Sequence, residues 1–262
     1  MPSNYAHYRF GSLALPELPE ERRRSLQRFR QLYDVGLHGP DLFFYYLPLF
    51  HTKTRELGGS YHKLTGKEFF ETAAARLREQ PSEGGEAYLF GVLGHYALDS
   101  ACHPLVNAAD AEGKIRHVEL ETEFDRHLLA LDGAETPETR DISGHMRLTW
   151  GECVTVSGFY PPASAYAIRL SVKSMALINR GLSLRNRKFV ETAFRLAHNS
   201  DLVKYSRPNR KCAPLIPQLQ TLFDEALGRY PAMANELEAC LRGGTPLGPE
   251  FDASFDGDIF QK

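Results

Sequence analysis

The chain has 262 residues, with 31 lysines and arginines against 33 aspartates and glutamates, so its formal net charge is −2 with histidine neutral. Hydrophobic residues make up 42% of the sequence and charged residues 24%, which excludes a wholly disordered chain. The even charge balance gives no reason to expect stable nucleic-acid binding. No run of about 18 apolar residues occurs, so we expect no membrane-spanning helix.

The start of the chain and the cysteines bear on the compartment. No apolar segment follows a basic start at the N-terminus, so we expect no secretory signal peptide. The four cysteines are widely spaced and form no C-x-x-C pair, so we expect them to be reduced: Cys102, Cys153, Cys212 and Cys240. These features predict a cytoplasmic location.

Apolar periodicity and Gly or Pro breaks predict an almost wholly helical chain. Helices are expected over 19–33, 66–79, 86–109, 114–131, 163–180, 186–202, 214–228 and 231–242. The helix over 86–109 is apolar on most faces, which indicates a buried central element. Residues 153–156 are strand-like, and residues 243–262 are expected to form an extended tail. The predicted fold is all-α, a multi-helix bundle in one domain over 1–262, with additional helices over 163–242 packed on the bundle.

Two consecutive predicted helices have histidines and acids at helical spacing. His95, Asp99 and His103 lie at i, i+4 and i+8, and therefore on one helix face. Burying an unpaired carboxylate is costly, and a divalent cation would satisfy all three groups. Imidazole and carboxylate ligands suit zinc, and also iron, manganese or nickel. His117 and Glu121 repeat the i, i+4 spacing. Alone, this pair fits a surface ion pair or a helix-capping contact as well as a metal site. Two sets of histidines and acids on consecutive helices, however, indicate a metal site between facing helices.

Further candidate ligands lie in the N-terminal third. Asp41 follows a Gly-Pro pair before an aromatic segment, where it could be a helix N-cap or a carboxylate that binds a metal at the edge of the core. His62 and His7 would each be unremarkable alone. His38 lies close to Asp41, and Asp125 lies one turn beyond the acid of the helix over 114–131, so both are candidates to orient a ligand.

Other residues have simpler interpretations. Cys102 is expected to point to another side of its helix than His103, so it is not counted as a ligand. Six basic residues and no acid occur from Arg169 to Lys188. A solvated helix face is the favoured interpretation, and steering of an anionic phosphate substrate is the alternative. The remaining histidines are interpreted as surface or hydrogen-bonded groups: His51, His127, His145 and His198.

Together these motifs resemble the zinc-dependent phospholipase C family, whose fold is shared with single-strand-specific zinc nucleases. The resemblance covers about residues 4–130 and is carried by His7-Tyr-Arg-Phe-Gly, Gly39-Pro-Asp41, His62, His95-x-x-x-Asp99-x-x-x-His103-Pro and His117-x-x-x-Glu121. It implies an all-helical bundle in which residues 1–132 hold a zinc cluster. The spacing of four between Asp99 and His103 is shorter than in the secreted phospholipases, so the similarity is to a diverged bacterial branch.

The resemblance also implies a ligand set. One zinc ion would be bound by Asp41, His62, His95 and Asp99. A second would be bound by His103, His117 and Glu121. Asp99 would bridge to a third, completed by His7 and, in secreted members, by the N-terminal residue of the mature chain. Since no cleavable leader is expected here, we expect two or three ions.

This ligand set predicts a metal-dependent phosphodiester hydrolase of phospholipase C type. Neighbouring metals lower the pKa of a bridging water and bind phosphoryl oxygens, so no protein nucleophile is needed. The sequence has no G-x-S-x-G motif and no P-loop. Asp41, on a loop at the cluster, is the candidate catalytic residue that orients or deprotonates the water. The expected substrate is a phosphate-ester small molecule or a phospholipid headgroup.

Three alternatives share the predicted metals. One is a nuclease or nucleotidase of the same fold. A second is a helical phosphohydrolase of the histidine-aspartate doublet type, but no His-Asp doublet occurs in the sequence. The third is a non-catalytic metal-binding scaffold, whose ions would have saturated ligands, whereas catalytic zinc keeps an open position.

Overall fold

The computed structural model describes residues 4–184, 189, 192 and 208–259. Over these residues the chain forms helices and two isolated bridges but no β-strand, which confirms the predicted all-α fold class. The α-helices are α1 Asn4–Ala14, α2 Glu20–Arg28, α3 Arg30–Gly36, α4 Lys53–His62, α5 Gly66–Glu79, α6 Glu83–Ala111, α7 His117–Leu131, α8 Trp150–Ser157, α9 Ala165–Ser183 and α11 Ile216–Gly243. None of these described helices is long and apolar enough to span a bilayer.

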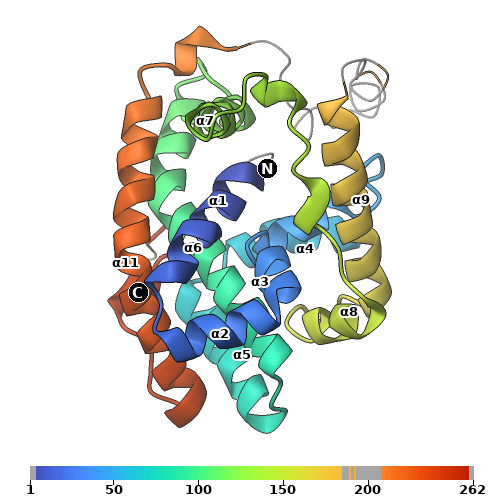
Figure 1. Cartoon of the computed structure of the whole chain (residues 1–262), viewed down its shortest axis with the longest axis vertical. Helices are drawn as coiled ribbons and strands as arrows, with labels where there is room; N and C mark the ends of the chain where they lie inside the picture. The colour runs from blue at the N-terminus through green and yellow to red at the C-terminus, as the bar shows by residue number, and fades with distance from the viewer. Residues whose placement is uncertain (1–3, 185–188, 190–191, 193–207, 260–262) are drawn as a thin grey trace.

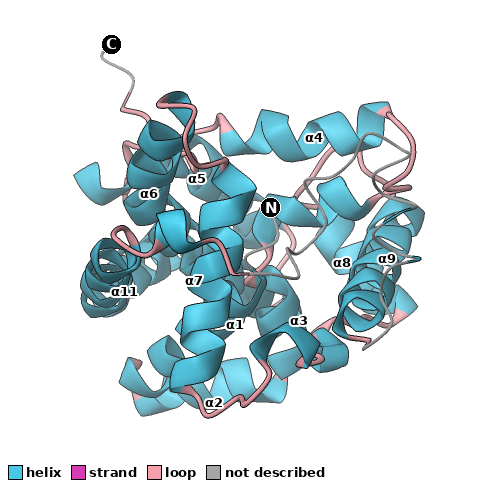
Figure 2. Ribbon diagram, turned by 90° about the horizontal axis from the view of Figure 1, so that it is seen from above, coloured by secondary structure: helices cyan, strands magenta, loops and turns pink. Residues whose placement is uncertain are grey.

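Helix α6 is the buried central element that the sequence predicted. Every residue from Ala87 to Asp99 is buried, and a helix that is apolar all round must be covered on all sides. Helices α3 and α11 make its most extensive contacts, and α1 and α7 also pack against it. Figure 1 shows α11 on one side of α6, with α8 and α9 at the opposite side of the molecule. Figure 2 shows the same helices from above.

The predicted helix boundaries agree with the structure to different degrees. Helix α5 spans the predicted residues 66–79, and the Thr65 hydroxyl and Glu68 carboxylate cap its first turn reciprocally. The predicted helix over 19–33 is divided at Phe29 into α2 and α3. The two predicted C-terminal helices are one helix, α11, with Pro231 inside it. The predicted helix over 186–202 lies outside the described residues.

Residues 153–156, predicted to be strand-like, lie instead in α8. The Thr149 hydroxyl accepts a hydrogen bond from the Glu152 amide, and the Glu152 carboxylate accepts one from the Thr149 amide. This capping box starts a helix that buries Cys153 and Val156, one turn apart, on the same face. Capping and packing therefore outweigh the β-propensity of the segment.

Residues 243–262 were predicted to be an extended tail, and their described part is a packed segment. Helix α11 ends in a left-handed cap at Gly244 (φ 70°), and the chain then folds back through the 3₁₀ helix η7 (Pro249–Phe251). Phe251 and Phe255 are fully buried, and both rings pack against Tyr96 of α6. Burial of two aromatic rings fixes this segment on the bundle.

Candidate metal centre

Eight side chains selected from the sequence meet at one place in the fold. They come from α1, the 3₁₀ helix η2 (Gly39–Tyr45), α4, α6 and α7: His7, Asp41, His62, His95, Asp99, His103, His117 and Glu121. All are buried except His117, whose side chain is 27% exposed. Their ligand atoms form three groups, His7–His95–Asp99, Asp41–His62–His95 and His103–His117–Glu121, each within 4.8 Å. The structure thus brings the whole predicted set together, and metal binding by it stays a prediction.

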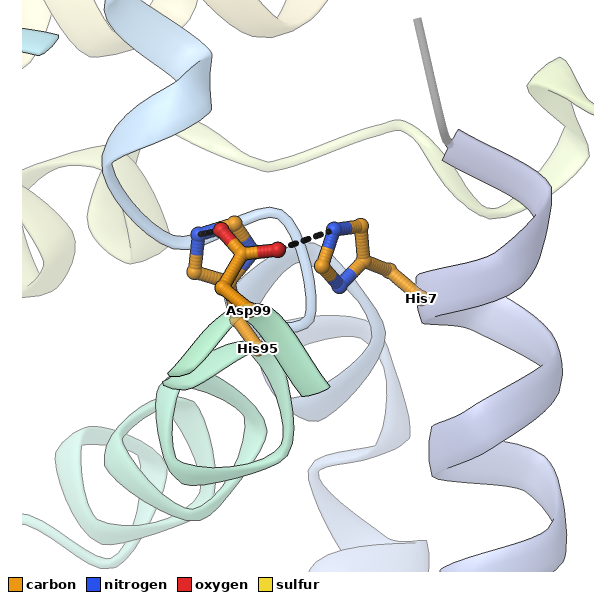
Figure 3. Close-up of side chains that lie close together, drawn as sticks. All are labelled: His7, His95 and Asp99. Atoms are coloured by element: carbon orange, nitrogen blue, oxygen red, sulfur yellow. Dashed lines mark ion pairs between the residues drawn. The ribbon is translucent and has the colours of Figure 1, made fainter. Parts of the chain in front are cut away.

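The Asp99 carboxylate lies at the middle of this cluster. Its Oδ1 is 3.2 Å from His7 Nε2 and 3.5 Å from His103 Nε2. Its Oδ2 is 3.0 Å from His95 Nε2 and 3.7 Å from His62 Nε2. Figure 3 shows the carboxylate between the rings of His7 and His95, which come from α1 and α6. One carboxylate therefore contacts four imidazoles, the arrangement expected of a bridging ligand.

The other two carboxylates each contact the nearest histidines. Asp41 Oδ1 is 3.0 Å from His62 Nε2. Glu121 Oε1 is 3.1 Å from His117 Nε2 and 3.5 Å from His103 Nε2. Together with the contacts of Asp99, these distances show that all five histidines turn Nε2 toward the carboxylates.

Gly39 allows η2 to approach α6 closely enough to place Asp41 at the cluster. Gly39 has φ +43°, a conformation that side chains with a Cβ rarely adopt. A Cβ at this position would lie 2.6 Å from Cδ2 of His95, so any larger residue would displace the ring. Pro40 then begins η2 with its fixed φ, and Asp41 follows on the first turn.

Helix α1 is held at its first turn by Asp125 of α7. The carboxylate accepts hydrogen bonds from the backbone amides of Tyr5 (3.1 Å) and Ala6 (2.8 Å). A carboxylate at a helix N-terminus satisfies orphan N–H groups and complements the helix dipole. Asp125 therefore acts on the backbone of the helix that carries His7.

Three of the five histidines have an oxygen close to the outward nitrogen. Nδ1 of His62 lies 2.7 Å from the Gly58 carbonyl, and Nδ1 of His117 lies 3.0 Å from Asn107 Oδ1. Nδ1 of His103 lies 3.3 Å from Asp256 Oδ1, in the C-terminal segment. When such an acceptor holds a proton on Nδ1, loss of the proton on Nε2 leaves a lone pair that faces the cluster, as in histidines that bind metals. Asn107 and Asp256 were not predicted from the sequence.

Inward-facing atoms of the cluster are buried without aligned hydrogen bonds. They include Nε2 of His62, His95 and His103, Oδ2 of Asp99 and Oε2 of Glu121. The three nitrogens lie at ion-pair distances from the Asp41 or Asp99 carboxylate, but without hydrogen-bond geometry. Buried polar atoms without partners are costly, and a divalent cation would satisfy several of them at once. The nitrogen and oxygen donors, with no thiolate, fit zinc.

A cavity of about 20 Å³ adjoins the cluster, and its walls include His7, Asp99, His103 and Glu121. This volume has room for about one water. Cys102 also lines this cavity, but it belongs to none of the three ligand groups, which agrees with its exclusion as a ligand. Burial raises the pKa of its thiol, which therefore stays protonated and is a poor metal ligand.

The charges of the cluster shift its proton equilibria. Burial lowers the pKa of His62, but the neighbouring carboxylates of Asp41 and Asp99 outweigh burial and raise it to about 10. Burial raises the pKa of Asp99, but His103, His95 and the other imidazoles outweigh it and hold that pKa well below its usual range. The metal-free cluster therefore holds protons between its carboxylates, and a metal must displace them.

His38 does not orient a predicted ligand through any described hydrogen bond. Its Nε2 lies 2.8 Å from Nε2 of His145, so one ring donates and the other accepts. Burial lowers the pKa of His38 well below its usual value and that of His145 to about 3, so both rings are neutral. His145 is a buried, hydrogen-bonded group, which agrees with one of the interpretations made from sequence. His198 lies outside the described residues.

The basic stretch that begins at Arg169 is described only in part. Arg169, Lys173 and Arg180 lie in α9, and the Arg169 guanidinium stacks over Trp150 at 5.9 Å. The other three basic residues lie outside the described ranges. Substrate steering by this stretch stays a prediction.

Comparison with known proteins gives one match. A family model described as zinc dependent phospholipase C matches residues 6–157, which is more than half of the 262 residues and includes all eight predicted ligands. No curated protein and no solved structure matches the chain. The matched span ends where α8 ends, so the packed C-terminal segment lies outside it. As its histidine and carboxylate motifs predicted, this chain belongs to the zinc-dependent phospholipase C family.

Proposed function

We propose that this protein is a metal-dependent phosphodiester hydrolase of phospholipase C type with two or three zinc ions. One observation carries the proposal: five imidazoles turn Nε2 toward three buried carboxylates, and many of these atoms have no aligned hydrogen bond. A purely structural hydrogen-bonded core would satisfy them. The family to which the chain belongs supports hydrolysis at this centre.

The eight residues divide into the three groups that share ligand atoms. One ion would be held by Asp41, His62, His95 and Asp99, and Asp99 also faces His7. Another ion would be held by His103, His117 and Glu121. Bound divalent cations would supply Lewis acidity and a water of lowered pKa. Iron, manganese and nickel accept the same donors.

Asp41 is the proposed catalytic base. Its Oδ1 is buried without an aligned hydrogen bond, 3.0 Å from His62 Nε2. It enters the cluster from a short 3₁₀ helix, whereas the other two carboxylates come from α6 and α7. Asp41 would orient the attacking water and take its proton, and the cleaved phosphodiester would be a small molecule or a phospholipid headgroup.

A cytoplasmic location belongs to the same proposal. All four cysteines lie among the described residues, all are buried, and none forms a disulfide. Reduced, buried cysteines are typical of intracellular proteins.

The test combines metal analysis with a substrate panel. Zinc-loaded wild-type protein is incubated with phosphatidylcholine vesicles, bis(p-nitrophenyl) phosphate and a single-stranded oligonucleotide, and released products are identified. We expect phosphodiester hydrolysis that a chelator abolishes and zinc restores. Asp41→Asn should lower kcat by about 10²–10⁴-fold while the metal content is measured in the same sample. Glu112→Gln, at the exposed C-terminal cap of α6, is the charge-matched control.

The products separate the alternatives. Diacylglycerol with a phosphorylated headgroup supports cleavage of phospholipase C type. Release of nucleotides alone would assign the nuclease activity instead. A full complement of zinc without hydrolysis of any substrate would overturn the proposal in favour of a metal-binding scaffold.

A further inference from the structure

The C-terminal segment crosses the metal-binding face of the bundle. The backbone amide of Asp256 donates to the His62 carbonyl (3.3 Å), and that of Phe255 donates to the Leu64 carbonyl (3.3 Å). The Phe255 ring packs against His62 and His95 at centroid distances of 6.1 and 6.0 Å. Residues outside the family match thus contact three predicted ligands, because Asp256 also reaches His103.

The C-terminal segment packs closely against helix α6 next to His103. Pro104 of α6 has no N–H, so it cannot donate a hydrogen bond to the Ser100 carbonyl one turn earlier. Gly257 lies against this turn with φ +79°, and a Cβ would come within 2.7 Å of the Pro104 ring and 2.9 Å of the Ser100 oxygen. Only glycine combines this conformation with this close approach. The contact fixes the adjacent Asp256 beside His103.

The Asp256 carboxylate meets the outward side of the His103 ring. Asp256 Oδ1 is 3.3 Å from His103 Nδ1, while Nε2 of the same ring faces Asp99 and Glu121, each at 3.5 Å. The ring is 1% exposed, and Nδ1 makes no aligned hydrogen bond. The Asp256 side chain is about one third exposed (34%), so it lies between the His103 ring and solvent.

We infer that Asp256 is a positioning residue for His103: its carboxylate keeps the proton on Nδ1 and turns the Nε2 lone pair to the metal centre. Carboxylates that accept from the second nitrogen of a histidine ligand fix its tautomer and raise its basicity. Gly58 and Asn107 serve His62 and His117 in the same way, but with neutral oxygens. The inference rests on the proposed function, since it concerns the zinc site of His103, His117 and Glu121.

The experiment measures zinc affinity rather than turnover. Full-length wild type, Asp256→Asn and Asp258→Asn are titrated with zinc against a chromophoric chelator. Asp258 is exposed and two residues away, so its variant makes the same charge change in the same segment. We expect Asp256→Asn to weaken one zinc site by about 10–100-fold, with the others unchanged. Asp258→Asn should behave as wild type, and Asp256→Glu should restore part of the affinity.

A second measurement needs no variant. Long-range ¹H–¹⁵N NMR of zinc-loaded wild type should show His103 as the Nδ1–H tautomer, with the Nδ1 proton shifted by a carboxylate acceptor. Equal zinc affinity in wild type and Asp256→Asn, or the Nε2–H tautomer, would overturn the inference and leave the proposed function standing. Wild type that binds no zinc would overturn both.

Discussion

Replacing Asp99 by asparagine removes one negative charge from the middle of the cluster and keeps the shape of the side chain. The carboxylate lies within 3.0–3.7 Å of four imidazole Nε2 atoms. A cation held by these nitrogens would lie about 4 Å or less from the lost charge. Two unit charges at about 4 Å interact by about 4 kcal/mol at an effective dielectric constant of about 20.

That energy corresponds to about a thousandfold in affinity, since each 1.4 kcal/mol is about tenfold. The loss should not be uniform. Asp99 belongs to one of the three ligand groups and contacts His62 of a second, whereas His103, His117 and Glu121 form a group without it. We therefore expect Asp99→Asn to retain about one zinc ion where wild type binds two or three. Glu121→Gln should show the converse and lose only the ion of its own group.

Elemental analysis after dialysis against a weak chelator gives the zinc content of each variant. Glu112→Gln removes an exposed carboxylate at the end of the same helix, and it should match wild type. Circular dichroism and a thermal melt of each metal-free protein show whether the variant is folded. If folded Asp99→Asn bound as much zinc as wild type, with similar affinity, the assignment of Asp99 as the bridging ligand would be wrong.

Four further results are expected. Zinc affinity should rise at least tenfold per pH unit up to about pH 10, because zinc displaces the proton of His62, whose pKa is about 10. Chelator competition at about pH 6.5, 7.5 and 8.5 measures this rise, and an affinity that does not change with pH would contradict the prediction. The free energy of unfolding of the metal-free protein should instead fall as pH rises. The stabilisation from a raised histidine pKa is complete below about pH 6.5 and is lost toward about pH 10. Asp125→Ala should lower the free energy of unfolding by about 1–2 kcal/mol in urea titrations, since the substitution leaves two backbone amides of α1 without their acceptor. It should also weaken zinc binding by His7, and unchanged stability would refute the anchoring role of Asp125. Removal of zinc by a chelator should lower Tm by roughly 5–10 °C in a thermal melt, because a ligand at about 100 times its Kd stabilises the folded protein by about 2.7 kcal/mol. An equal Tm shift in Asp99→Asn would show that the chelator acts elsewhere.

The helix stripe of the site was predictable because its pattern is local. His95, Asp99 and His103 share one face of α6 solely through their spacing, and the same holds for His117 and Glu121 of α7. These groups stood out because their side chains contrast with an otherwise apolar helix.

The rest of the ligand set was not encoded in a local pattern. His7 and His62 lie on α1 and α4, which the periodicity did not predict, and only the resemblance to a family joined them to the cluster. Asp256 was missed altogether, because its contact with His103 joins segments far apart in the sequence. The available signal was the pair Phe251 and Phe255, whose large apolar side chains are out of place in a solvated tail.

The single helix α11 shows how tertiary contacts override a local rule. Pro231 removes one backbone donor and normally ends a helix, which led to two predicted helices instead of one. The preceding residue, Tyr230, is fully buried and donates to the Phe90 carbonyl at 2.9 Å. Met233 and Ala234 are buried on the following turn. Packing on both sides of the proline keeps the helix continuous.

The helices beyond the family match complete the core of the part that carries the ligands. Phe223 of α11 packs edge-on against Phe10 of α1, with ring centroids 5.4 Å apart. The Arg22 guanidinium bridges Glu86 of α6 and Glu238 of α11 at 2.9 and 3.3 Å. Helices α6 and α11 therefore share one interior, which supports the expectation of a single domain.

Truncation after Ser157, at the end of the family match, should therefore abolish folding. It removes large side chains of α11 that are almost wholly buried, among them Leu219, Phe223, Tyr230 and Leu237. Loss of each such side chain costs about 2–5 kcal/mol, so loss of four costs about 8–20 kcal/mol, which is of the same size as the total stability of about 5–15 kcal/mol of a typical domain. We expect the truncated chain to be insoluble or to lack a cooperative thermal transition. A soluble fragment with a sharp transition and wild-type zinc content would show that residues 1–157 are a domain by themselves and that α11 only covers it.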